Sequence, residues 1–152
     1  MQEQNEIQKQ FRRQQEKYVY YLIALSVTAI GFSVYKTTGH ELKWTQLPLA
    51  FSVASWGLSV FCGLKFLKYV ISTLYANNAY FDILQGKHPK VGNHPQKIKA
   101  ATSGVKQAMQ TNSDKASSYS KWQGRLFYVG IILFIVWHVF EMYQLSIKCI
   151  DY

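Results

Sequence analysis

Residues 47–64 contain no charged side chain, and this run constrains the fold more than any other part of the chain. A helix rises about 1.5 Å per residue, so these residues extend about 27 Å, close to the thickness of a bilayer core. Two further apolar runs, at residues 19–35 and 126–143, have a similar length. A soluble domain of 152 residues could not bury three such runs. The sequence therefore predicts an all-α integral membrane protein with three transmembrane helices.

Small residues lie on one face of each of the first two predicted spans. In lipid, such faces let helix backbones approach closely, whereas a narrow pore can use the same hydroxyl groups to bind water. We expect the two faces to pack together in an antiparallel hairpin, because residues 36–46 form only a short connection. Packing is favoured over pore lining, since serine hydroxyls usually bond to helix backbone. The residues are Ser52, Ser55, Ser59, Cys62 and Gly63 on the second span, and Ala24, Thr28 and Gly31 on the first.

The three runs divide the chain into five parts. A polar cytoplasmic N-terminal helix at residues 1–18 precedes the transmembrane hairpin at residues 19–72, whose spans lie at about 19–35 and 47–64. A basic cytoplasmic segment at residues 73–124 leads to the third transmembrane helix at residues 125–145. A short tail at residues 146–152 ends the chain.

Within the basic segment, helical spacing of apolar residues predicts that the second helix continues to about residue 84. Residues 85–95 contain two glycines and two prolines, which predicts a loop. A weak apolar stripe predicts a short surface helix over residues 96–112. Ser113 and Asp114 are typical of a helix N-terminus, so we expect a new helix to begin there.

The distribution of basic residues predicts the orientation. The chain has 17 Lys and Arg against 8 Asp and Glu, a net charge of +9. Fourteen of the basic residues lie before residue 18 or within residues 65–125. Because basic residues collect on the cytoplasmic side, we expect both regions in the cytoplasm and the C-terminus outside, in a bacterial inner membrane.

The basic residues also indicate possible partners. Anionic lipid headgroups attract cationic side chains beside a span, and so would an acidic surface on a cytoplasmic protein. Nucleic acid is disfavoured, because lipid offers the same attraction at no extra distance. The candidate contact residues are Lys65, Lys68, Lys97, Lys99, Lys106, Lys121 and Arg125.

Two ionisable residues, His138 and Glu141, lie within the third predicted span and share a helix face. Ionisable groups inside a membrane usually face the bundle or a water path, which suggests a role in conduction, gating or proton handling. The alternative is that both lie close enough to the outer interface to be hydrated. His88 and His94 are each followed by proline with no carboxylate or thiol nearby, so we interpret them as turn residues and predict no metal site.

No catalytic motif is present: the chain lacks a phosphate-binding glycine loop, HExxH, CxxC and a nucleophile elbow. We predict neither an enzyme nor a cofactor, and Cys62 and Cys149 form no disulfide framework. The leading hypothesis is a small homo-oligomeric membrane protein that forms a pore or perturbs the membrane, as toxin or antiviral defence effectors do. The alternative is a non-conducting anchor or scaffold subunit that binds a partner through residues 73–124.

Overall fold

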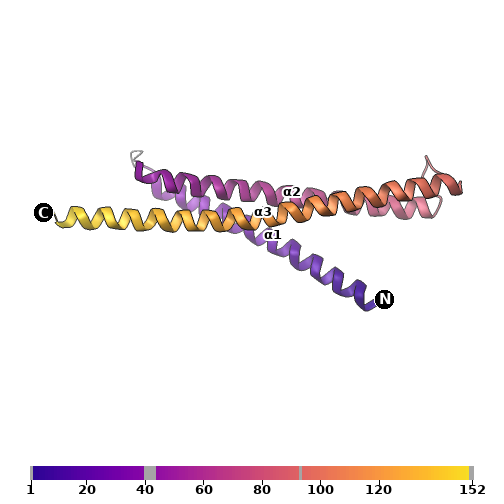
Figure 1. Ribbon diagram of the computed structural model, residues 1–152, viewed down its shortest axis with the longest axis horizontal. Coiled ribbons are helices and arrows are strands. Elements are labelled where there is room, and N and C mark those ends of the chain that lie inside the picture. Colours follow the sequence, from indigo (N-terminus) through magenta and orange to yellow (C-terminus); the bar gives the residue numbers. More distant parts are fainter. Residues whose placement is uncertain (1, 40–43, 93, 151–152) are drawn as a thin grey trace. The chain divides into compact units, whose positions relative to one another are not determined.

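The computed structural model describes residues 2–39, 44–92 and 94–150, and all regular elements in these ranges are helices (Figure 1). Helix α1 spans Gln2–Thr37, α2 spans Leu47–Leu84 and α3 spans Pro95–Ile150. A short 3-10 helix, η1 (Trp44–Gln46), precedes α2. The described chain is therefore all-α, as the sequence predicts.

Each long helix contains a stretch that is long and apolar enough to cross a membrane. The stretches lie within Lys9–Thr37, Trp44–Leu84 and Pro95–Gln144. With 38 and 56 residues, α2 and α3 extend about 57 Å and 84 Å, well beyond the roughly 30 Å of a bilayer core. The prediction of three helices of membrane-spanning length is confirmed, and all three continue far past that length, since α1 with 36 residues also extends about 54 Å.

The predicted C-terminus of the second helix is confirmed at Leu84. Gly86 adopts a positive φ of 68° just after the helix, a conformation that glycine reaches without steric cost. The Lys87 amide donates to the Asp82 carbonyl at 2.9 Å and the Gly86 amide to the Ile83 carbonyl at 3.1 Å. This pair of bonds is a Schellman motif, which satisfies carbonyl groups at a helix end.

The expected helix boundary at Ser113 and Asp114 is wrong, because α3 continues through both residues. Asp114 Oδ1 accepts a hydrogen bond at 3.1 Å from Gln110 Nε2, one turn earlier on the same helix. The carboxylate thus pairs along the surface of a helix instead of capping a new one. Residues 105–123 contain neither glycine nor proline, so nothing in this stretch breaks the helix.

The chain forms two compact units. Unit 1 comprises Met1–Gly63 and Lys121–Tyr152, and unit 2 comprises Leu64–Ser120. In unit 1, one large side chain from each helix enters a shared core: Leu22 from α1, Trp56 from α2 and Phe127 from α3. Ala29, Ile30, Ile131 and Phe134 pack around these three.

Unit 2 is a pair of helices, formed by the second part of α2 and the first part of α3. Phe66 and Ile83 of α2 and Ala116 of α3 are buried. The rings of Tyr69 and Tyr119 stack with centroids 5.7 Å apart. Asn112 Nδ2 donates to Ser72 Oγ at 3.0 Å, which adds a polar contact beside the apolar ones.

Candidate functional site

Five polar side chains are fully buried in unit 1, and three of them, Ser52, Ser59 and Gln123, take part in hydrogen bonds between helices. We call these three residues the polar seam. Ser52 Oγ donates to the Gly130 carbonyl at 2.7 Å, and Ser59 Oγ donates to the Gln123 carbonyl at 3.0 Å. Both hydroxyls, two of the predicted packing or pore-lining groups, therefore bind α2 to α3. Interhelical bonds of this kind contribute about 0.6–2 kcal/mol each in an apolar environment.

Gln123 joins all three helices of unit 1. Its side-chain Nε2 atom donates to the Val19 backbone carbonyl of α1 at 3.2 Å, while its backbone carbonyl accepts the hydrogen bond from Ser59 Oγ of α2. Its Oε1 atom is buried and has no hydrogen-bond partner in the described ranges. A buried amide in a helical bundle is tolerated only where neighbouring groups hold it, so this side chain fixes α1 against α3, while the backbone of the same residue binds α2.

Gln123 is not among the predicted packing residues, because it lies in the basic segment between Lys121 and Arg125, both assigned to the membrane surface, where a polar side chain needs no partner. A signal was present in the spacing. Gln123, Phe127, Gly130 and Phe134 follow one another at intervals of four, three and four, which places them on one face of α3.

Two glycines mark the closest approach of the helices in unit 1. A Cβ atom added at Gly130 would lie 2.5 Å from Trp56 Nε1, and one added at Gly63 would lie 2.6 Å from Gln123 Nε2. The Trp56 indole thus lies directly against the backbone of α3. Gly63 is one of the residues that the sequence singled out for packing, whereas Gly130 was not recognised.

The remaining small residues of the two predicted faces lie elsewhere. Ser55 and Cys62 are half-buried on α2. Ala24, Thr28 and Gly31 are exposed, and Thr28 Oγ1 bonds to the Ala24 carbonyl of its own helix at 2.9 Å.

Within one chain, this face of α1 therefore does not pack against the serine face of α2, contrary to the expectation. Helix α1 instead turns Val19 and Leu22 inward, together with Ser26 and Ser33. The larger side chains fill the space beside Trp56 that a small face would leave empty. A packing role for the Ala24 face between chains stays a prediction.

The two ionisable residues of the third apolar stretch lie in the C-terminal part of α3. His138 is exposed, with its ring 6.3 Å from the ring of Trp137, and Glu141 is half-buried. In the described ranges, no group of three or more His, Cys, Asp or Glu side chains could hold a metal ion. The structure thus places no further acidic or histidine group with them, and their role in conduction or proton handling stays a prediction.

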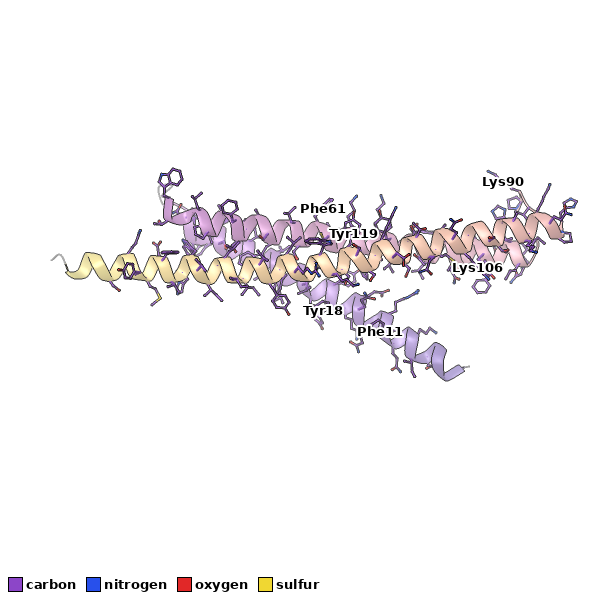
Figure 2. The ribbon with its side chains drawn as sticks, viewed as in Figure 1. Phe11, Tyr18, Phe61, Lys90, Lys106 and Tyr119 are labelled. Atoms are coloured by element: carbon purple, nitrogen blue, oxygen red, sulfur yellow. The ribbon has the colours of Figure 1, made fainter. Side chains whose placement is uncertain are left out.

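The candidate basic residues lie mostly at the surface. Lys68, Lys97, Lys99, Lys106, Lys121 and Arg125 are exposed, and Lys65 is half-buried. In unit 2 the Lys106 Nζ atom lies 5.5 Å from the ring centroid of Tyr80, and the Lys115 Nζ atom lies 5.7 Å from that of Tyr69. Figure 2 labels Lys106 and Tyr119 on α3 and Lys90 in the loop before it. These cation–π contacts hold two lysines of α3 against tyrosine rings of α2 without neutralising their charge.

No protein-family model, no curated protein and no solved structure matches this chain. The geometry alone therefore has to indicate the function. In unit 1 it provides a tightly packed helical core, in which the polar seam is hydrogen-bonded except at Gln123 Oε1. In unit 2 it provides an exposed basic surface on a helical pair.

Proposed function

We propose that this chain is a three-span membrane protein that acts as a non-conducting anchor or scaffold and presents the helical pair of unit 2 to a partner. The main observation is that Ser52 and Ser59 donate to α3 carbonyls inside a single chain. A pore lined by these serines needs their hydroxyls to face water. Since they are fully buried and already paired, packing is their favoured role.

Membrane insertion is supported by the apolar surface of α3. Between residues 128 and 143 this helix exposes a series of large apolar side chains, which in water would form an unusually large patch. Towards lipid, the same side chains are an ordinary outer surface. They are Tyr128, Val129, Ile132, Ile135, Val136, Val139, Phe140, Met142 and Tyr143.

The proposed topology follows the basic residues. The N-terminus and unit 2 lie on the cytoplasmic side of a bacterial inner membrane, and the connection between α1 and α2 lies outside. The exposed lysines of unit 2 then face anionic headgroups and a cytoplasmic protein partner. Both are attracted by the same charges, over about one Debye length.

Ion flux across reconstituted vesicles separates an anchor from a pore. We expect the full chain, inserted in liposomes under a potassium diffusion potential, to release no more trapped dye or potassium than protein-free liposomes do. Flotation on a density gradient confirms insertion in the same samples. Leakage that disappears in Ser55→Leu, at unchanged flotation, would contradict the anchor and establish an oligomeric pore of the effector type.

A further inference from the structure

The part of α2 in unit 2 carries apolar side chains on two opposite faces. One face packs on α3, where Phe66 and Ile83 are 2% and 3% exposed. The other face has no partner in the described chain. Its large side chains are about half exposed: Leu64 55%, Ile71 52%, Leu74 50% and Phe81 51%.

The side chains of this second face, exposed except for the half-buried Leu67, follow a regular spacing. We define the outer face as Leu64, Leu67, Ile71, Leu74, Asn78 and Phe81, which are separated alternately by three and four residues. This is the a and d spacing of a coiled coil, with Leu64, Ile71 and Asn78 at position a and the other three at position d. Lys68 and Asp82 flank this face, so it carries no charge itself. The pattern is typical of a helix that pairs with another helix.

We propose that the outer face of α2 binds the outer face of a second copy of this chain. The exposed area is sufficient. Four half-exposed large side chains, with the adjacent Tyr75 and Leu84, offer about 600 Å² per chain, near the lower limit for a specific interface. Because this face carries no charge, a partner that binds through acidic or basic side chains does not fit it.

The two copies of α2 run parallel, because both chains cross one membrane in the same direction. This orientation rests on the proposed function, whereas the contact face does not. In a parallel pair, equivalent a positions meet, so Asn78 faces Asn78 of the second copy. A single asparagine at position a favours two strands and one register, because the two amides bond to each other. Lys68 and Asp82 then lie beside Gly63 and Asn77 of the second copy, so no like charges meet.

The same spacing continues along α2 towards its N-terminus. Ala50, Val53, Gly57 and Val60 extend the alternation of three and four. A Cβ atom added at Gly57 would meet nothing within 4 Å, so this glycine is not needed for packing inside the chain. Small residues let helices approach closely where lipid surrounds them, and large aliphatic ones stabilise a pair in water.

Disulfide trapping in the full chain tests the proposal. Cys62→Ala and Cys149→Ser provide a background without native thiols. In reconstituted vesicles, mild oxidation is expected to cross-link Asn78→Cys into a dimer at least about tenfold faster than Ser103→Cys, since only facing thiols reach bonding distance. Ser103 is the matched control because it is exposed on α3 of the same unit. Equal rates at the two positions would overturn the proposal.

Three further variants complete the test. In an antiparallel pair of these helices, only residues near the two-fold axis at the middle of the contact meet their own copy, and Tyr75 lies close to that point. Faster cross-linking of Tyr75→Cys than of Asn78→Cys would therefore contradict the parallel arrangement. Ile71→Lys is expected to convert dimers to monomers in single-molecule subunit counting, whereas Gln107→Lys, at an exposed position on α3, leaves them intact. Flotation reports insertion separately: cross-linking at Asn78→Cys in protein that does not float would contradict the membrane location and retain the dimer face.

Discussion

Gly130→Ala is expected to destabilise unit 1 by about 2 kcal/mol or more, although it adds a single methyl group. The new Cβ atom would lie 2.5, 2.6 and 2.9 Å from Nε1, Cδ1 and Cε2 of Trp56. An indole ring cannot bend out of the way, and Trp56 is itself buried against Leu22 and Phe127. The helices must therefore move apart, which also lengthens the Ser52 bond to the Gly130 carbonyl. Unfolding of the full chain in mild detergent, followed by tryptophan fluorescence, measures the loss.

Gly124→Ala is the matched control. Gly124 lies on the same helix in the same unit, and an added Cβ atom would contact only the Tyr18 hydroxyl, at an ordinary 3.7 Å. Alanine is the better helix former by about 1 kcal/mol, so this variant is expected to be neutral or slightly more stable. Equal stability of the two variants would show that α2 and α3 do not meet at Gly130.

The second large effect is expected at Gln123. In Gln123→Glu a carboxylate oxygen takes the place of the Nε2 donor and faces the Val19 carbonyl oxygen, in a site with no solvent exposure. An unpaired buried charge costs about 3–5 kcal/mol, so the variant is expected to unfold or to fail to assemble. The same unfolding measurement in detergent quantifies the loss.

Two controls distinguish charge from shape at this position. Gln123→Met keeps the length of the side chain, loses one bond and removes the unpaired Oε1 atom, so its stability is expected to stay within about 1 kcal/mol of the original. Gln107→Glu places the same charge at an exposed position on α3 and is expected to be neutral. A Gln123→Glu chain as stable as Gln123→Met would place residue 123 in water.

The long helices could be predicted from the sequence because the average apolarity of 18 residues is a local property. The signal for the end of α2 is equally local, since Gly86 supplies the positive φ that a helix end needs. The continuity of α3 was not predicted, because Ser113 and Asp114 are as common at a helix start as on a helix surface. The Gln110 bond to Asp114, together with the lack of glycine and proline around it, places this carboxylate on the surface of a continuous helix.

The interior of unit 1 could be predicted only in part. Ser52, Ser59 and Gly63 were identified as one face of α2, since their spacing alone places them together. Which residues of α1 face inward depends on the volume left by the other helices. The space beside Trp56 is filled by Leu22, whereas the small face of Ala24 would leave it partly empty. No pattern within α1 contains that information. Gln123 was missed for a related reason, because its partners come from two other helices.

The central claim is that the apolar stretches of α1, α2 and α3 cross a bilayer, with unit 2 in the cytoplasm. Labelling of single cysteines with a membrane-impermeant maleimide in intact cells tests it most directly, in the background without native thiols. Thr38→Cys, exposed between α1 and α2, is expected to react in intact cells. Ser103→Cys, exposed in unit 2, is expected to react only after the cells are lysed. Labelling of Ser103→Cys in intact cells, or protection of both positions until lysis, would contradict the topology and with it the proposed function.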